Sequence, residues 1–566
     1  MLGKRTVQDS LFTPATRLRK KIGEESFYVF LGDHRHEIFR DEDFSMLYCS
    51  DNGRASVPPS LLAMALILQT YTRVSDQEAT ERAQFDQRWQ AALGLGEDDV
   101  PFAKSTLCLF RNQLILHNQA KLIFTKGLDY LRRAGFIKKH KLSIALDTTP
   151  IFGKGAVQDT YNMLAEGLYQ VLRVLACLSS QSTEAFAANH DFTRYVASSF
   201  KATHPIDWDD ESERSTVLNS LVADCRRVLA LASQRLKAYP PESEEATRII
   251  TATELLRKLL VQDVHETASG KAELIQGVAP DRIVSVHDTE MRHGRKSVTQ
   301  RFDGYKAAIA VEPASQVIAD VDVIAANAHD SQDAPALIEQ AGTNLEAPID
   351  TVLGDTAYGT VDARLDARTH HYELIAPVSR APRTGRFTKD DFVIDLSNET
   401  VTCPNGQSTS LWYRRKVTTR RGTTFFNKAF RFGLEQCRAC PIRSQCIQET
   451  TAYRSLDVHE HEALIQDAKA FQRTQTYRSL YRDRVVAEHR IARLVRLGIR
   501  NARYMGSAKT LFQLAIAAAV ANLSLFAGHL SHEALSVLLQ TLMGVVLLAA
   551  ILLRIDQGPF TFTPVP

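Results

Sequence analysis

Residues 487–510, AEHRIARLVRLGIRNARYMGSAKT, form the basic segment on which the expected fold depends. The segment has no Pro and only two Gly, and apolar residues recur in it at helical spacing. This pattern predicts an amphipathic helix that continues from the preceding residues. Tyr481, Arg484 and Glu488 would then share one face, at positions i, i+3 and i+7.

Glu488 is unusual because it lies among many positive charges. Between residues 471 and 510, nine Arg and one Lys accompany only two carboxylates, Asp483 and Glu488. One interpretation is a surface ion pair between Arg484 and Glu488. The other is a metal-binding carboxylate surrounded by groups that bind phosphate. The second interpretation requires two further carboxylates upstream.

Composition limits the function classes. The chain has 566 residues, 44 % of them apolar and 23 % charged, which is typical of a globular protein of several domains. A net charge of +3 means that nucleic-acid binding would depend on local basic patches. The N-terminus, MLGKRTVQDSLF, lacks the apolar core of a secretory signal, and eight Cys in this length do not indicate a disulfide scaffold. We therefore expect a cytoplasmic protein.

A hydrophobic tail is predicted at residues 529–566. Within it, residues 534–553 contain 20 residues without a charge, which is long enough to cross a bilayer. The alternative is an apolar helix buried against the rest of the chain or against a second copy. We favour burial because Ser536, Gln540 and Thr541 dilute the hydrophobicity, so no membrane partner is expected.

Residues 1–140 are predicted to be helical. Pro58 and Pro59 open a helix that continues through LLAMALILQTYTRV, a second is expected over residues 76–93, and Ser105 is placed to cap a third. Three short helices with polar turns are typical of a helix-turn-helix-like DNA-binding module. A helical scaffold or dimerisation domain is the alternative.

Two short apolar runs each end in an aspartate. LSIAL, residues 142–146, predicts a buried strand that ends at Asp147, within a first catalytic segment of residues 141–159. IDTVLG, residues 349–354, predicts another strand, followed by Asp355. Open α/β sheets place their sites at the C-terminal ends of strands. The alternative for Asp147 is a turn residue before Thr-Thr-Pro.

Residues 160–275, between these strands, are predicted to form an all-helical insertion. The core then resumes over residues 276–378, where residues 282–312 predict a strand, a basic loop and a second strand. A further strand is expected over residues 317–326, followed by a helix from Asp330 or Ser331 to Ala341. The cations of the basic loop are suited to phosphate contact: Arg295, Lys296, Arg301 and Lys306.

Residues 379–465 are predicted to form a small, basic antiparallel β insertion. Arg414 and Arg415 occur there beside aromatic residues, which indicates a surface for nucleic acid, with a solvated β surface as the alternative. Four thiols in this region are candidates for a structural zinc site, although Cys-x2-Cys pairs also occur without metal: Cys403, Cys437, Cys440 and Cys446. The other four Cys are expected to be ordinary buried thiols.

Asp147, Asp355 and Glu488 together can hold two Mg²⁺ or Mn²⁺ ions about 4 Å apart. One ion can activate water or a 3′-hydroxyl for attack on a phosphodiester, and the other can stabilise the leaving oxygen. Each carboxylate alone is weak support for such a site, whereas the ordered trio in basic surroundings is much stronger.

The chain resembles bacterial insertion-sequence transposases of the DDE class. The resemblance is carried by LDTTPIFGKGAVQDTYN, RFDGYKAAIAVE, VLGDTAYG and YRDRVVAEHRIARL. SVPPSLLAMALILQ and SDQEATERAQFDQRWQAALGL resemble the helical N-terminal domain of an InsH-type group, and CPNG with CRACPIRSQC resembles its cysteine-bearing insertion. The catalytic acids of the family would fall on Asp147, Asp355 and Glu488.

This resemblance implies an α+β or α/β fold: a ribonuclease-H-like mixed sheet with a helical N-terminal domain, a helical insertion after the first strand and a cysteine-bearing β insertion before the last catalytic helix. The catalytic C-terminal helices would occupy residues 466–528. In the family signature Tyr-x2-Arg-x3-Glu-x6-Lys, Tyr481, Arg484 and Glu488 match, but Val495 replaces the final basic residue. Tyr481 and Arg484, with Arg503 and Lys509 nearby, are expected to contact DNA.

The resemblance also implies double-stranded DNA as partner, both as terminal inverted repeats and as target, and a homodimer on paired ends in the bacterial cytoplasm, associated with the nucleoid. Two rival functions remain open. One is a catalytically decayed, transposase-derived DNA-binding protein. The other is a metal-dependent nuclease without strand transfer. The sequence does not give the terminal repeats, the target preference or the use of hairpin intermediates.

Overall fold

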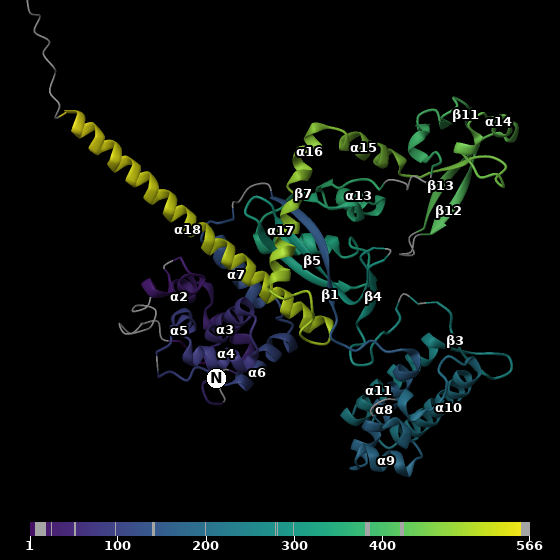
Figure 1. Ribbon diagram of the computed structural model, residues 1–566, viewed down its shortest axis with the longest axis horizontal. Helices are drawn as coiled ribbons and strands as arrows, with labels where there is room; N and C mark the ends of the chain where they lie inside the picture. Colours follow the sequence, from purple (N-terminus) through teal and green to yellow (C-terminus); the bar gives the residue numbers. More distant parts are fainter. Residues whose placement is uncertain are drawn as a thin grey trace, which may run out of the picture.

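The structure is a computed structural model that describes most of the chain (Figure 1). The exceptions are residues 6–18, 24, 50–52, 97, 138–141, 198–199, 278, 280, 298, 380–384, 419–423 and 556–566, and only the backbone is described for residues 532–555. The predicted domain boundary at residues 140 and 141 lies outside the described residues.

The N-terminal region is helical, as predicted. Its elements are α2 (Phe27–Ile38), η1 (Asp41–Leu47), α3 (Pro59–Thr72), α4 (Asp76–Phe85), α5 (Gln87–Leu93), α6 (Lys104–Leu116) and α7 (Leu122–Arg133). Helix α3 starts with Pro59 in its first turn and is buried from Pro59 to Gln69. It is therefore the central helix of this region.

Two N-terminal predictions were wrong in detail. The single helix predicted over residues 76–93 is split at Asp86, whose extended backbone ends α4 and whose side chain caps α5 by accepting from the Arg88 N–H. The third helix begins at Lys104, after Ala103, so Ser105 lies inside it and is not its cap.

A mixed six-stranded sheet forms the centre of the molecule. Its strands are β1 (Leu142–Phe152), β4 (Arg292–Arg295), β5 (Arg301–Glu312), β6 (Val317–Ala325), β7 (Ile349–Leu353) and β8 (Glu373–Ile375), in the order β4-β5-β1-β7-β8 with β6 also paired to β5. β5 is antiparallel to β1, β4 and β6, whereas β7 is parallel to β1 and β8. Between these strands lie α12 (Ala334–Leu345), η4 (Thr356–Tyr358) and α13 (Val361–Thr369). The mixed α and β architecture confirms the predicted fold class at this level.

The first strand is longer than predicted. β1 continues through Asp147 to Phe152 because antiparallel pairing with β5 extends from Ala145 to Phe152. Parallel pairing with β7, in contrast, stops at Ala145. The prediction that Asp147 ends the strand was therefore wrong for the whole strand, although Asp147 does lie just beyond its parallel pairing.

Two further expectations differ from the structure. Residues 282–288 are irregular, so the first strand predicted there is absent, and pairing begins only at β4. α12 begins at Ala334, after Asp333, rather than at Asp330 or Ser331, and Asp330 is paired with Lys306.

The insertion after β1 is helical with one addition. It contains α8 (Thr160–Leu178), α9 (Thr183–Asn189), η2 (Thr193–Tyr195), η3 (Lys201–Thr203), α10 (Glu211–Leu236) and α11 (Glu244–Asp263). It ends in a small hairpin of β2 (Val264–Glu266) and β3 (Ala272–Leu274), so it is not all-helical as predicted. Its buried residues form a hydrophobic core separate from that of the sheet, and it stands apart from the N-terminal helices in Figure 1.

The basic region after β8 forms the predicted antiparallel insertion. Its elements are η5 (Lys389–Asp391), β9 (Val393–Asp395), β10 (Thr400–Thr402), β11 (Ser408–Thr409), β12 (Trp412–Thr418), β13 (Thr424–Arg431), α14 (Leu434–Arg438), η6 (Arg443–Gln445) and β14 (Ser455–Val458). They make two three-stranded sheets, β11-β10-β9 and β12-β13-β14.

The C-terminal region contains α15 (Glu462–Gln472), α16 (Gln475–Arg482), α17 (Val485–Arg496) and α18 (Ser507–Ile555). The single helix predicted across residues 481–510 was therefore wrong. The chain turns at Asp483, α17 ends before Gly498, and a second turn contains Gly506. Both glycines have positive φ, +95° and +92°, which other residues rarely adopt.

The turn between α17 and α18 is fastened to the end of β1. Asn501 forms a parallel bridge with Phe152, and the Arg500 guanidinium donates to Thr149 Oγ1 at 2.9 Å and to the Pro150 carbonyl at 2.8 Å. These bonds hold the start of α18 and the end of α17 against the strand that carries Asp147.

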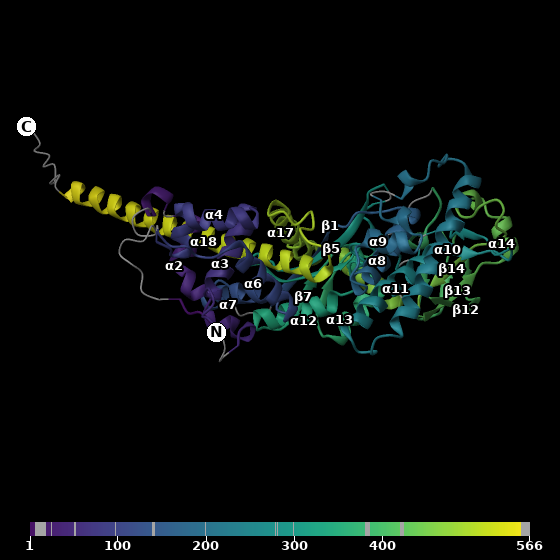
Figure 2. The same ribbon diagram turned by 90° about the horizontal axis from the view of Figure 1, so that it is seen from below.

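α18 runs between the N-terminal helices and the sheet, and its C-terminal part projects beyond both (Figures 1 and 2). The residues from Phe512 to Ala527 that face inward belong to the same hydrophobic core as α3, α7 and β6. Among the described residues, Ser507–Ser531 is long and apolar enough to cross a membrane, but 72 % of its most apolar part is buried inside the protein. The side chains of residues 534–553 lie outside the described part.

Candidate active site

Asp147 and Asp355 lie at the same level of two neighbouring parallel strands. The register pairs Ala145 of β1 with Leu353 of β7, and each aspartate follows two residues later. Residues two apart on a strand point to the same face. Asp355 then leaves the strand and caps η4, where its Oδ1 accepts from the Ala357 N–H at 2.8 Å. The sheet therefore brings together two carboxylates that are far apart in sequence.

Glu488 joins this pair through Arg484. Glu488 lies in the first turn of α17, and Arg484 directly precedes that helix. The Arg484 guanidinium lies 3.6 Å from Asp147 Oδ2 and also pairs with the Glu488 carboxylate. Arg484 thus connects the strand acid to the helix acid. The surface-pair interpretation of Glu488 and the catalytic one are both compatible with this contact.

The electrostatics of Asp147 reflect this crowding. Burial raises the pKa of Asp147 to about 6, against the lowering effects of the Thr148 N–H and of Arg484. The negative charges of Asp355 and Glu488 raise the same pKa further. Asp355 and Glu488 are therefore close enough to Asp147 to disfavour its charged form, which is the setting that a bound cation relieves.

We expect Asp147→Asn to stabilise the protein at neutral pH. An Asp with a raised pKa favours the folded state when it is protonated, and that contribution is lost as the pH rises through about 6. Removing the charge should therefore increase the free energy of unfolding by about 1–3 kcal/mol at pH 7.5, and by much less at pH 4.5. Thermal denaturation without divalent ions at both pH values measures this difference.

Asp191→Asn is the control for that measurement, because its side chain is 91 % exposed. It should change stability little at either pH. A loss of stability in Asp147→Asn that is equal at both pH values would contradict the burial and repulsion inferred for Asp147.

The donor chemistry of the site fits Mg²⁺ or Mn²⁺, since three carboxylates supply the oxygen ligands that these ions prefer. Within the part of the chain that the structure describes, however, no group of three or more His, Cys, Asp or Glu side chains is arranged to hold a metal ion. Arg484 instead pairs with two of the three acids. Holding a metal would require these side chains to move closer together.

Two residues near the acids were missed by the sequence analysis. Tyr358, in η4, is 3 % exposed, and its pKa is raised by burial and then by the charges of Asp330, Asp147 and Asp355. The other residue is Asp330, whose charge acts on Tyr358 and whose carboxylate lies 2.7 Å from Lys306 Nζ. The closeness of Tyr358 to Asp355 in sequence was a signal, whereas nothing local indicated Asp330.

Tyr481 and Arg484, predicted to contact DNA, lie beside the acids. The Tyr481 ring stacks on Tyr477 with centroids 5.4 Å apart, and the Arg484 guanidinium lies 5.7 Å from the Tyr481 ring. Tyr481 belongs to α16 and Arg484 to the turn after it. The predicted common face therefore arises from a turn and not from one helix.

The other predicted DNA contacts divide into two groups. Lys306 is held by Asp330, Arg415 by Asp457, and Arg503 lies 3.8 Å from Asp76 and donates to the Val74 carbonyl. The remaining predicted cations are exposed on the surface: Arg295, Lys296, Arg301, Arg414 and Lys509. The second group is therefore better suited to bind phosphate.

Val495, which departs from the family signature, packs against the hydrophobic core. A basic residue would be poorly placed at a position that faces the core. Arg493 donates to Ser524 Oγ of α18 at 3.3 Å, and Arg496 is exposed. Arg493 therefore fastens α17 to α18. Of the two basic residues in the last turn of α17, Arg496 is the one without such a contact to a described residue.

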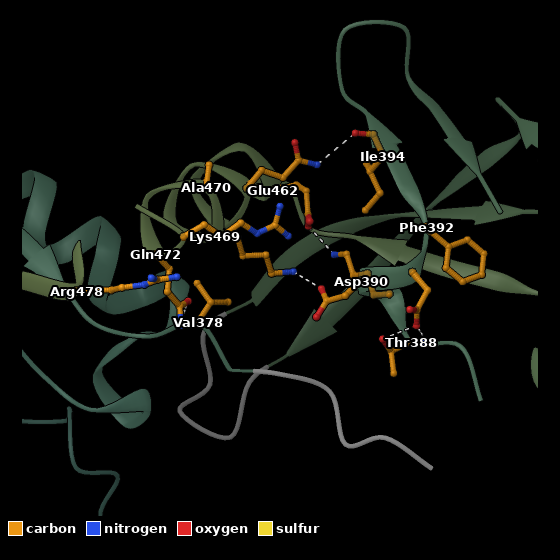
Figure 3. A pocket seen from close by; sticks show the side chains of 14 residues that line it. Val378, Thr388, Asp390, Phe392, Ile394, Glu462, Lys469, Ala470, Gln472 and Arg478 are labelled. Carbon is orange, nitrogen blue, oxygen red and sulfur yellow. Dashed lines mark hydrogen bonds and ion pairs between the residues drawn. The ribbon is translucent and has the colours of Figure 1, made fainter. Parts of the chain in front are cut away.

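A cavity of about 1050 Å³ lies between α15 and the β insertion (Figure 3). Two ion pairs cross it, Lys389 with Glu462 and Lys469 with Asp390. None of the three acids lines it. We place the chemistry at the acids, because DNA needs an open face, and the Glu488 side chain is 52 % exposed.

The cysteines differ from expectation in part. Among the four predicted to be ordinary buried thiols, Cys225 is buried, whereas Cys108 is half-buried and Cys49 and Cys177 are exposed. The four candidates for a metal site are all half-buried and free: Cys403, Cys437, Cys440 and Cys446.

Two family models match the chain. One, described as "Transposase DDE domain", matches residues 402–526, which include Glu488 but neither aspartate. The other, described as "Transposase domain (DUF772)", matches residues 16–113 in the N-terminal helices. Comparisons with curated proteins and with solved structures found no match. Both matched models describe transposase domains, and together they support an insertion-sequence transposase of the DDE class.

Proposed function

We propose that the protein binds the terminal inverted repeats of its own insertion sequence, hydrolyses the phosphodiester at each end and joins the freed 3′ end to target DNA. The observation that carries this proposal is the contact of Arg484 with both Asp147 and Glu488, with Asp355 at the level of Asp147 after the neighbouring strand. These residues come from a strand, from the turn after the neighbouring strand and from a helix, which are distant in sequence, as the transposase class requires.

The proposal includes a ribonuclease-H-like catalytic core. Three antiparallel strands, β6, β5 and β1, are followed across the sheet by the parallel strands β7 and β8. The two strands that carry aspartates are neighbours in this order. This arrangement supports the assignment, because Asp147 and Asp355 lie at the same level of neighbouring strands and α17 packs against β1.

In this proposal Asp147, Asp355 and Glu488 hold Mg²⁺ or Mn²⁺. Such ions would supply activation of the attacking water or 3′-hydroxyl and stabilisation of the leaving oxygen. Before DNA binds, the Arg484 guanidinium neutralises both the Asp147 and the Glu488 carboxylates. When DNA is bound, a phosphate group is an alternative partner for this guanidinium. Tyr481 supports the Arg484 guanidinium through its ring face.

Exposed cations would hold the DNA backbone. Arg414 lies 3.7 Å from the Phe426 ring centroid and makes no ion pair with a described residue. Arg415, the next residue, is paired with Asp457 at 2.9 Å. We place double-stranded DNA across the hairpin of β12 and β13 and across the three acids. The protein would act as a homodimer on the paired ends, in the cytoplasm.

Arg414→Ala should weaken DNA binding about threefold to tenfold and reduce the slope of log affinity against log salt by about one, as expected for one lost phosphate contact. Arg415→Ala is the matched control, because Asp457 already neutralises that guanidinium. Fluorescence anisotropy with labelled duplex DNA at several salt concentrations measures both. Equal effects of the two substitutions would argue against phosphate contact by Arg414.

The test of function uses the DNA that flanks the gene. Both flanks are cloned around a marker, the full chain is expressed, and excision and insertion junctions are sequenced. We expect marker excision and junctions at inverted repeats. Binding of the flanks without any cleavage would instead support a decayed DNA-binding protein, and cleavage without joined products would support a nuclease.

A further inference from the structure

Arg500 is a half-buried cation in the turn between α17 and α18, and it makes no ion pair with a described residue. Its guanidinium forms hydrogen bonds through Nη1 alone, which donates to Thr149 Oγ1 at 2.9 Å and to the Pro150 carbonyl at 2.8 Å. Both acceptors are neutral. A charge that is partly withdrawn from water is favoured when an opposite charge accompanies it, so this position favours the binding of an anion.

The turn is held against β1 by contacts that do not involve the Arg500 side chain. The Phe152 N–H donates to the Arg500 carbonyl at 2.8 Å, and the Ala502 N–H donates to the Phe152 carbonyl at 2.7 Å. From α18, Gln513 Nε2 donates to the Asn501 carbonyl at 3.0 Å. A neutral donor would serve the two neutral acceptors on β1 as well as a guanidinium does. The charge of Arg500 therefore points to a second partner.

The position of Arg500 is set by the strand that carries Asp147. Thr149 follows Asp147 by two residues on β1, and the pairing of β1 with β5 continues through both without a shift of register. Residues two apart on a strand point to the same face and lie about 7 Å apart. Thr149 therefore fixes the Arg500 guanidinium on the face of the sheet that presents Asp147, one repeat of the pleat farther along the strand.

The other side of the Arg500 guanidinium is open. Nε and Nη2 donate to no described residue, and neither nitrogen is buried. A planar guanidinium presents its N–H groups in a rigid fork that matches the oxygens of a phosphate group. Because Nη1 is fastened to β1, the orientation of this fork is set before any ligand binds.

We propose that Arg500 binds a backbone phosphate of the DNA strand that is cleaved, within two nucleotides of the scissile bond. The inference rests on the proposed function, in which the scissile phosphodiester lies at Asp147. Each strand of duplex DNA rises about 3.4 Å per nucleotide, so about 7 Å along β1 corresponds to two nucleotides. Arg500 would fix the position of the strand relative to Asp147 and take no part in breaking the bond.

A chemical double-mutant cycle tests this contact. In duplex DNA that carries the end of the element, one backbone phosphate at a time is replaced by a neutral methylphosphonate, and anisotropy measures the affinity of the full chain and of Arg500→Gln. We expect Arg500→Gln to weaken binding of unmodified DNA about threefold to tenfold, as for one lost phosphate contact. At one position near the scissile bond this loss should disappear, because the phosphate is already neutral. Independent losses at every position would overturn the proposal.

Arg496→Gln is the matched control, because Arg496 is an exposed cation in the last turn of α17. It should show no coupling at the phosphate that couples to Arg500. If thermal denaturation shows that Arg500→Gln is unfolded, Arg500→Lys replaces it, since an ammonium keeps the charge but not the fork. Its affinity should fall about twofold to threefold on unmodified DNA and remain unchanged on DNA neutralised at that phosphate. Equal losses on both DNAs would overturn the proposal.

The cycle measures binding alone, so its outcome is separate from that of the proposed function. A chain that shows the coupling but cleaves no DNA would count against the proposed function and leave the Arg500 contact intact. Independent losses in a chain that does cleave would have the reverse meaning.

Discussion

Asp355→Asn is expected to reduce cleavage of end-bearing DNA by at least about 10³-fold while leaving DNA affinity unchanged. The substitution keeps the shape of the side chain and the Oδ1 acceptor for the Ala357 N–H, so η4 should remain capped. It removes one charge from the site where, in the proposed function, the three carboxylates act as a unit. Cleavage assays with Mg²⁺ and with Mn²⁺, beside anisotropy for binding, measure the two effects separately.

Glu488→Gln should give the same loss from the opposite side of the site, since Glu488 comes from α17 and not from the sheet. Glu373→Gln is the control, because Glu373 is an exposed acid on β8, next to the strand that precedes Asp355. It should leave cleavage within about twofold of the unaltered chain. Full activity in Glu488→Gln would show that Glu488 is only the surface partner of Arg484.

Asn522→Leu is expected to cost about 2–4 kcal/mol of local stability. Asn522 is 1 % exposed, and its side chain pairs with both backbone groups of Ile318, accepting from the N–H at 2.9 Å and donating to the carbonyl at 2.8 Å. Leucine has a similar volume but leaves two buried polar groups of β6 without these bonds. Amide hydrogen exchange of peptides from β6 and α18 reports the loss locally.

The control for this substitution is Asn112→Leu, because Asn112 is exposed on α6. It should leave exchange in β6 and α18 unchanged. Unchanged protection of these elements in Asn522→Leu would mean that packing alone, and not the asparagine, fastens α18 to the sheet. The helix would then be less specifically placed than the two hydrogen bonds indicate.

Local sequence patterns predicted the elements that depend on local properties. The Pro-initiated helix α3, the apolar strands β1 and β7 and the β insertion each follow from periodicity or from turn residues. The predictions that failed depended on distant partners. β1 continues past Asp147 only because β5, more than a hundred residues later, supplies its pairing.

The grouping of the site was predictable only in part. Asp147 and Asp355 could be expected near each other, since each directly follows a short apolar run of sequence. The turn at Arg484 could not, because the residues from Tyr481 to Leu494 have helical spacing without a break. Asp330 was missed since only the fold brings it to Lys306 and Tyr358. Local spacing does not reveal such contacts.

The central claim is that residues 147, 355 and 488 share divalent ions, and iron-directed cleavage of the protein tests it most directly. Fe²⁺ can replace Mg²⁺ on oxygen ligands, and with ascorbate and peroxide it cuts the backbone nearest to it. We predict that the backbone of the unaltered protein is cut at three places, near Asp147, Asp355 and Glu488. Excess Mg²⁺ should suppress all three cuts. Breaks at only one of these places, or elsewhere in the chain, would contradict the account.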